Sequence, residues 1–211
     1  MKNKVITLVV GSVRTNTYIY YNEENRHGVI IDPGAEAGKI LTEAKAHNLD
    51  IKGILLTHGH FDHTKAADEL RNALNIPIYA SEEDAALAND PALCGTAAFK
   101  MKPITVTVDK ILRDNEELDF GFGKIQVLHT PGHTHGSVCL YAPDDDIIFT
   151  GDCLFKESYG RYDFPTGKLS ALKNSLQRLF DILPEKTVVY PGHMEATTMG
   201  HEKLHNPIGR Q

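Results

Sequence analysis

The chain has 211 residues, of which 41% are hydrophobic and 24% charged, and its formal net charge is −6. This length suits a single domain over residues 1–211 with a substantial buried core. The negative charge disfavours nucleic-acid binding, which needs a basic surface. Val5–Val10, the longest apolar run near the start, is too short for a membrane span or a signal peptide. Three cysteines without a CxxC spacing indicate reduced thiols, so we expect a cytoplasmic protein with no membrane partner.

Apolar and β-branched runs between polar turns predict strands, and apolar residues at helical spacing predict helices. In chain order we expect strands Val5–Val10, Thr17–Tyr21 and Gly28–Ile31, helix Ala35–His47, strand Ile51–Leu56, helix Thr64–Leu74, strands Ile78–Ala80, Thr105–Val108, Ile125–Leu128, Val138–Tyr141 and Ile147–Phe149, helix Leu169–Leu183 and strand Thr187–Tyr190. Strands come first in groups and then alternate with helices. This order predicts a mixed α/β domain built in layers.

The segment Thr57–His63 holds three histidines and an aspartate directly after a predicted buried strand. Placing these groups close together contributes little to the stability of a fold, because they compete for water and repel one another when protonated. Neutral imidazoles and a carboxylate are, however, suitable ligands for zinc, iron or manganese. The candidate ligands here are His58, His60, Asp62 and His63.

Three later strands each end in a glycine that is followed at once by another candidate ligand. His133 follows Pro131-Gly132, Asp152 follows Gly151, and His193 follows Pro191-Gly192. Ligands at strand ends can converge along one rim of a sheet, where a rigid scaffold holds the loops. Seven candidates exceed what one tetrahedral zinc can use, but they fit two ions that share a bridging carboxylate.

The motifs THxHxDH at Thr57–His63, TPGHTxGS at Thr130–Ser137, Gly151-Asp152 and Pro191–His193 resemble those of the metallo-β-lactamase superfamily. Within it, Gly151–Gly167 resembles the short bacterial subgroup of the glyoxalase II, or hydroxyacylglutathione hydrolase, group. The resemblance implies a four-layer αββα sandwich with a metal site at one edge of the sheets. It assigns His58, His60 and His133 to the first metal, Asp62, His63 and His193 to the second, and Asp152 to a bridging position.

The resemblance also implies a binuclear metallohydrolase that cleaves S-lactoylglutathione or a similar small-molecule thioester. Attack comes from a metal-bridging hydroxide, which Asp62 orients while it ligates the second metal. A thiolate leaves easily, so no strong general acid is required. Two divalent ions are expected, zinc first, with iron or manganese as alternatives. The assembly is expected to be a monomer or a homodimer.

Lys156, Tyr159 and Arg161 follow the predicted bridging aspartate, and cations beside a phenol suit a substrate carboxylate. The glyoxalase II group binds the carboxylate of its thiol with a basic residue at the position that Arg161 occupies. The alternative for Arg161 is an internal salt bridge with Asp163. Glyoxalase II enzymes proper also have a C-terminal helical substrate region, which we do not expect in this chain.

Two other activities of the superfamily are alternatives. Persulfide dioxygenases share these motifs and a GRxDF string, present here as Gly160–Phe164. They use one iron, for which His58, His133 and Asp152 are candidates, in a geometry suited to O₂ chemistry. Hydrolysis of a lactone or another ester is the second alternative, whereas the bridging aspartate does not favour a β-lactamase.

The segment His201–His205 matches HExxH, which is the zinc-binding motif of a class of metalloproteases. Asn206-Pro207 ends any helix directly after it. We therefore interpret this motif as part of the surface rather than as a metal site.

Overall fold

The computed structural model describes residues 3–208 of the chain. The strands are β1 (Asn3–Val10), β2 (Thr15–Asn22), β3 (His27–Ile31), β4 (Asp50–Leu55), β5 (Ile78–Ala80), β6 (Lys110–Ile111), β7 (Glu117–Asp119), β8 (Lys124–His129), β9 (Val138–Ala142), β10 (Ile147–Gly151), β11 (Leu154–Phe155), β12 (Ser158–Tyr159), β13 (Val188–Pro191) and β14 (Thr197–Thr198). The helices are α1 (Ala37–Ala46), α2 (Phe61–Thr64), α3 (Ala67–Leu74), α4 (Glu82–Ala88), α5 (Leu169–Ile182) and α6 (Met199–His205), with a 3₁₀ turn at Pro143–Asp145.

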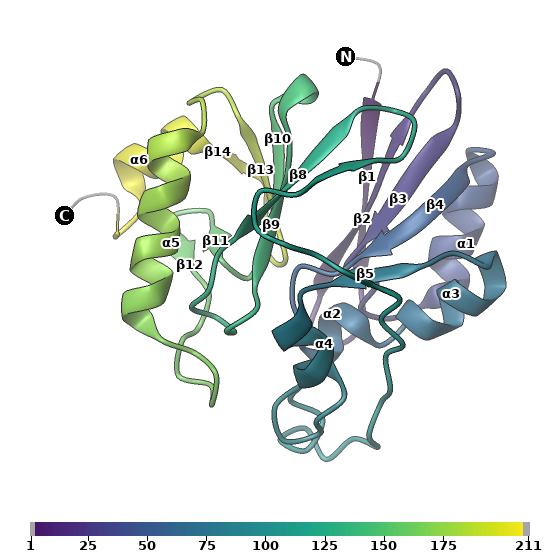
Figure 1. The fold of residues 1–211 in the computed structure, drawn as a ribbon, viewed down its shortest axis with the longest axis horizontal. Coiled ribbons are helices and arrows are strands. Elements are labelled where there is room, and N and C mark those ends of the chain that lie inside the picture. The colour runs from purple at the N-terminus through teal and green to yellow at the C-terminus, as the bar shows by residue number, and fades with distance from the viewer. Residues whose placement is uncertain (1–2, 209–211) are drawn as a thin grey trace.

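Two six-stranded sheets lie face to face between helices, which confirms the predicted four-layer αββα arrangement (Figure 1). The first sheet has the order β1-β2-β3-β4-β5-β6 and the second the order β14-β13-β10-β9-β8-β7. In the first sheet β3, β4, β5 and β6 are parallel neighbours, and in the second β10 runs parallel to β13. Helices α1 and α3 cover the outer face of one sheet, and α5 covers that of the other.

Three apolar clusters hold these layers together. One joins the first sheet to α1 and α3 through side chains such as Ile40 and Leu70. The middle cluster fills the space between the sheets, where Tyr20 and Phe149 are among the largest fully buried side chains. The third packs α5 on the second sheet through Leu172 and its neighbours. Burial on both faces explains why the central strands are continuous apolar runs.

Most predicted elements are present, but the strand expected at Thr105–Val108 is wrong. The backbone N–H groups of Val106 and Thr107 donate to the side chains of Asn89 and Asp68, at 3.0 and 2.8 Å, instead of to a neighbouring strand. Side chains that satisfy the backbone locally compete with sheet pairing. The β-branched composition of this segment therefore misled the prediction, and β6 begins only at Lys110.

The single helix expected at Thr64–Leu74 is divided into α2 and α3. Between them the N–H of Ala66 donates to the carbonyl of Pro33 at 2.9 Å, a partner 33 residues back in the sequence. The short elements β6, β7, β11, β12, β14, α4 and α6 were not predicted.

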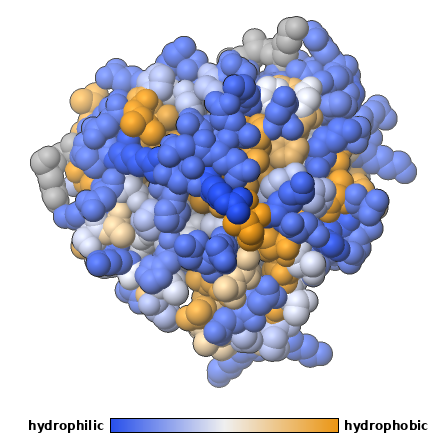
Figure 2. Space-filling model, viewed as in Figure 1, coloured by the Kyte–Doolittle hydropathy of each residue, from blue (hydrophilic) through white to orange (hydrophobic). Residues whose placement is uncertain are grey.

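The surface carries mainly hydrophilic residues, with hydrophobic ones among them (Figure 2). Figure 2 shows a mostly hydrophilic face, with hydrophobic residues gathered toward its lower middle, around α4. Cys94, Cys139 and Cys153 are free and buried, as the sequence predicts. Within residues 3–208 no helix is long and apolar enough to cross a membrane.

Candidate metal centre

All seven predicted ligands lie at one edge of the two sheets, five of them in loops and Asp62 and His63 in the short helix α2. Those of Thr57–His63 follow β4 and enter α2, His133 follows β8, Asp152 follows β10, and His193 follows β13. The turns are close to one another, since the N–H of Gly192 donates to the carbonyl of Gly151 at 2.8 Å. Strands of both sheets thus deliver side chains to one point.

The first predicted ligand set is a compact cluster of buried imidazoles. The ring centroids of His58, His60 and His133 are 4.6 to 4.8 Å apart in pairs. His60 Nδ1 lies 2.8 Å from His133 Nε2. One ligand atom from each residue lies within 4.8 Å of the other two, so the three together can hold one metal ion.

The second predicted set adjoins the first. His63 Nε2 lies 3.6 Å from Asp62 Oδ2 and 3.4 Å from His193 Nε2, and His193 Nε2 lies 3.3 Å from Asp62 Oδ2. Asp152 lies between the sets: its Oδ1 is 3.3 Å from His63 Nε2, and its Oδ2 is 3.6 Å from His133 Nε2. One carboxylate therefore faces both groups of imidazoles with different oxygens.

Hydrogen bonds on the far side of the rings determine which nitrogen faces the centre. His63 Nδ1 donates to Asp32 Oδ2 at 2.9 Å, and His133 Nδ1 donates to the carbonyl of Arg161 at 2.7 Å. His58 Nδ1 lies 3.2 Å from the Thr57 hydroxyl, which itself donates to Asp32. When the three rings are neutral, these bonds leave their Nε2 lone pairs free to accept a metal ion.

Burial dominates the protonation of two imidazoles in the first set. Burial lowers the pKa of His60 to about 3, with a further contribution from His133. Burial, followed by the neighbouring His63, also holds the pKa of His58 well below its ordinary value. Both imidazoles are therefore neutral near pH 7, which is the form that binds metal.

The acidic groups have the opposite effect in the second set. Burial raises the pKa of Asp62, but His63 and His193 outweigh it and bring that pKa to about 2. The pKa of Asp152 likewise lies below its usual range, because His63 outweighs burial. Burial lowers the pKa of His63, yet Asp62 and Asp152 raise it well above its ordinary value. Both carboxyl groups are thus ionised, which is the form that can bind a metal ion.

The residues present fit a metal centre. His58 Nε2 and Asp152 Oδ1 are buried and have no hydrogen-bond partner among residues 3–208. Buried polar atoms are rarely left unpaired, because their desolvation is not compensated. A divalent cation at these nitrogen and oxygen atoms satisfies both, and the metallo-β-lactamase fold implies such ions. The donor set, imidazole with carboxylate and no thiolate, suits zinc, iron or manganese.

Sequence reasoning missed Asp32, which is buried beside the centre. It accepts hydrogen bonds from His63, the N–H of Thr57 at 2.7 Å and the Thr57 hydroxyl at 2.5 Å. With His58 and His63 it forms a third group whose ligand atoms lie together. A signal was present, because Asp32 directly follows the predicted strand Gly28–Ile31 and precedes Pro33-Gly34, although its order differs from the glycine-then-ligand pattern of the other strand ends.

The three predicted substrate residues lie on the surface near this edge and are engaged with other side chains. The Arg161 guanidinium forms a two-pronged salt bridge with Asp163, at 2.9 and 2.8 Å, and its side chain is 67% exposed. Lys156 pairs with Glu195 at 3.0 Å. The Tyr159 ring lies 6.5 Å from that of Tyr162. The internal salt bridge considered for Arg161 is therefore present.

The HExxH segment belongs to none of the ligand groups found among residues 3–208, but it is not the surface segment that we expected, because its glutamate is buried. It lies in α6, which ends at His205. Glu202 is fully buried and accepts hydrogen bonds from Thr197, Asn206 and the N–H of Glu157. His201 pairs with Glu157 at 3.0 Å. The glutamate stabilises the packing of α6 instead of facing a metal.

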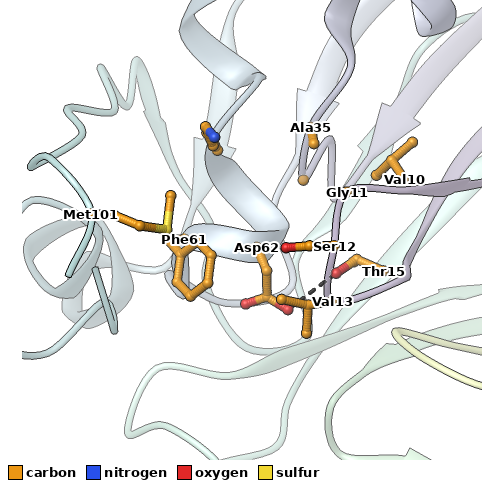
Figure 3. A pocket seen from close by; sticks show the side chains of 11 residues that line it. Val10, Gly11, Ser12, Val13, Thr15, Ala35, Phe61, Asp62 and Met101 are labelled. Atoms are coloured by element: carbon orange, nitrogen blue, oxygen red, sulfur yellow. Dashed lines mark hydrogen bonds between the residues drawn. The ribbon is translucent and has the colours of Figure 1, made fainter. Parts of the chain in front are cut away.

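A cavity of about 50 Å³ lies beside Asp62, on the side of the β1–β2 turn. Figure 3 shows the Asp62 carboxylate between Phe61 and Val13, with the Thr15 hydroxyl donating to Asp62 Oδ2 at 3.0 Å. Met101 closes the wall next to Phe61. Asp62 is thus shared by the metal centre and by a small, largely apolar hollow.

Comparisons with known proteins agree with this geometry. The model of the metallo-beta-lactamase superfamily matches residues 10–193. The chain therefore belongs to the metallo-β-lactamase superfamily, and it is a metallohydrolase-type enzyme. It is 35% identical to the probable metallo-hydrolase YqgX of Bacillus subtilis and 32% identical to the hydroxyacylglutathione hydrolase GloC of Haemophilus influenzae. Each match covers 94% of this chain and 94% of the relative.

Three solved structures share the whole fold. BLEG-1, described as a B3 metallo-beta-lactamase, has a TM-score of 0.93 and 37% identity, with 99% of this chain and 100% of that one covered. TTHA1623 in a di-iron-bound form has a TM-score of 0.84 and 38% identity, with coverages of 96% and 99%. ETHE1 from Myxococcus xanthus has a TM-score of 0.82 and 30% identity, with coverages of 99% and 85%.

Proposed function

We propose that this protein is a binuclear thioester hydrolase of the glyoxalase II type, acting on S-lactoylglutathione or a similar acyl thioester. The observation that carries this proposal is the position of Asp152, whose two oxygens face two adjoining ligand sets. His58, His60 and His133 hold one ion, Asp62, His63 and His193 hold the other, and Asp152 is shared. Zinc is the first candidate for both ions.

Ions bound there supply a Lewis acid for the substrate carbonyl and a nucleophile generated from water near neutral pH. The chain itself contributes position and charge. Asp62 is partly exposed beside the cavity and ionised, so it orients the attacking water by accepting its hydrogen bond. The Thr15 hydroxyl holds this carboxylate in place.

The protonation of the site supports a substrate with a good leaving group. The pKa values of both carboxyls at the centre lie below their ordinary range, so neither Asp62 nor Asp152 carries a proton to donate. Amine and alkoxide leaving groups need such a proton, whereas a thiolate is stable without one. The likeness to GloC over 94% of both chains supports the same substrate class.

The cavity beside Asp62 supports a short acyl group. Its volume of about 50 Å³ has room for a few non-hydrogen atoms, and Val13, Phe61 and Met101 give it apolar walls. We place the thiol part of the substrate on the opposite side, near Tyr159, Lys156 and Arg161. A substrate carboxylate bound there has to displace Asp163 from Arg161 or Glu195 from Lys156.

A second candidate function is iron-dependent oxidation of a persulfide. Iron as the metal is in line with the likeness to TTHA1623, which was solved in a di-iron-bound form, whereas this function needs a single iron. A facial arrangement of His58, His133 and Asp152 on one iron suits O₂ chemistry. Hydrolysis of a lactone or a β-lactam would use the same centre. Because the chain resembles BLEG-1, a β-lactam has to be tested as a substrate beside the thioesters.

One experiment separates these functions. Enzyme reconstituted separately with zinc, iron and manganese is given S-lactoylglutathione, other acyl thioesters, a lactone, a chromogenic cephalosporin and glutathione persulfide, with metal content and O₂ uptake measured throughout. We expect two ions per chain and fastest turnover of a thioester without O₂ uptake. Hydrolysis of no thioester contradicts the proposal, and one iron with O₂ consumption establishes the dioxygenase instead.

A further inference from the structure

Asp84, outside every motif discussed so far, connects the two loops that carry the first ligand set. It lies in the first turn of α4 and is buried. Its Oδ2 accepts the N–H of Gly59 at 2.9 Å and the hydroxyl of Thr134 at 2.7 Å, and its Oδ1 accepts the N–H of Gly136 at 3.0 Å. Gly59 belongs to the loop after β4 and the other two to the loop after β8, so one carboxylate joins loops from different sheets.

The contacted residues are immediate neighbours of ligands. Gly59 separates His58 from His60, and Thr134 follows His133. A Cβ on Gly59 would lie 2.5 Å from the Asp84 carbonyl oxygen, and one on Gly136 would lie 2.7 Å from Asp84 Oδ1. Side chains cannot fit at those distances. Both loops therefore approach α4 as closely as backbone alone allows, and this approach fixes their separation.

The second ligand set is held by different groups. Asp32 orients His63, the Thr15 hydroxyl bonds Asp62, and the carbonyl of Arg14 lies 3.4 Å from His193 Nδ1. The three hydrogen bonds to the Asp84 carboxylate all come from the loops of the first set. The Asp84 carboxylate thus supports only the loops of the first set, whereas Asp32 holds His63 and also reaches His58 through the Thr57 hydroxyl.

We propose that Asp84 is a positioning residue that holds His58 and His60 against His133, and that its loss weakens metal binding selectively at this set. An ionised carboxylate has only acceptors, which matches three donors. Asparagine has the same shape but turns an NH₂ group toward one or more of these donors, so at least one buried hydrogen bond is lost. Groups that orient metal ligands typically change affinity by about 10–100-fold when they are mutated. This inference rests on the ligand sets assigned in the proposed function.

The test measures metal affinity, not turnover. Zinc dissociation constants from chelator competition, together with visible spectra of the cobalt-substituted protein, are compared for the intact chain, Asp84→Asn and Asp90→Asn. Asp90 is the matched control, because its exposed carboxylate accepts the N–H of Ala92 just beyond α4. His60→Ala and His193→Ala assign the two binding steps to their sets.

We expect Asp84→Asn to weaken the step assigned by His60→Ala by about 10–100-fold and the other step less than threefold, with Asp90→Asn unchanged. Equal weakening of both steps, or of neither, overturns the inference. Thr134→Val removes one donor only, so it gives a smaller loss at the same step and replaces Asp84→Asn if that variant does not fold. If neither histidine variant removes an ion, the ligand assignment itself fails.

Discussion

Asp32 Oδ2 lies 2.9 Å from Nδ1 of His63, in a position where both side chains are buried. The same oxygen accepts the Thr57 hydroxyl, which in turn lies against His58 Nδ1. One carboxylate therefore determines which nitrogen two candidate ligands present to the centre. This arrangement contrasts with Asp84, whose hydrogen bonds go to the loop backbone and to a threonine beside the ligands.

We expect Asp32→Asn to weaken metal binding at both ligand sets by about 10–100-fold, because it removes the acceptor behind His63 and, through Thr57, the one behind His58. Chelator competition with zinc measures this effect. Asp119→Asn is the control, since Asp119 is an exposed carboxylate that accepts the N–H of Gly121. Unchanged affinity in Asp32→Asn contradicts an orienting role.

Replacing Asp62 by alanine is expected to abolish thioester hydrolysis or to lower kcat by about 10²–10⁴-fold. The reason is that one carboxylate is lost that both orients the water and binds the second metal. The ion at His58, His60 and His133 remains, so metal analysis should show about one ion instead of two. Glu69→Ala, an exposed carboxylate in the neighbouring α3, serves as the control. Wild-type turnover by the Asp62 variant rules the mechanism out.

Acidification should release the two ions in sequence. Protons compete with metal at His63 and His193, whose pKa values are raised by neighbouring carboxylates against the effect of burial. The pKa values of His58 and His60 are lowered, chiefly by burial, so protons bind there only at much lower pH. As pH falls, the ion of the second set should therefore leave first. Metal content after dialysis at each pH measures the order, and simultaneous loss of both ions contradicts it.

Gly34 and Gly38 provide a matched pair of stability tests. A Cβ on Gly34 would lie 1.6 Å from the carbonyl oxygen of Asp62, so Gly34→Ala must displace the backbone that carries this ligand. We expect a loss of roughly 1–3 kcal/mol or more in the free energy of unfolding. Gly38 is exposed in α1 and a Cβ there meets nothing within 4 Å. Gly38→Ala should gain up to about 1 kcal/mol.

Urea unfolding of both metal-free variants measures these changes. Equal stabilities of the two variants would show that the contact between Gly34 and the Asp62 backbone is not tight. The same comparison in the metal-loaded protein reveals whether the displaced loop also weakens metal binding.

The chemistry of the centre was readable in the sequence because it is encoded locally. Thr57–His63 packs four candidate ligands into seven residues, and His133, Asp152 and His193 each follow a glycine at a strand end. Apolar runs likewise predicted most central strands, since strands buried on both faces need continuous apolar side chains. Thr105–Val108 was the exception, because side chains distant in the sequence occupied its backbone N–H groups.

Only the tertiary structure decided which groups act together. His60 meets His133 across 73 residues, Asp152 turns one oxygen to each ligand set, and the Arg161 guanidinium is paired with Asp163. Asp32 and Asp84 became visible as supports of the centre only when their partners were brought within hydrogen-bond distance. Sequence spacing restricts side chains a few residues apart, whereas these contacts depend on how the two sheets pack face to face and bring their loops together at one edge. The sequence by itself determined the ligand types, and the packing of the sheets decided their pairing.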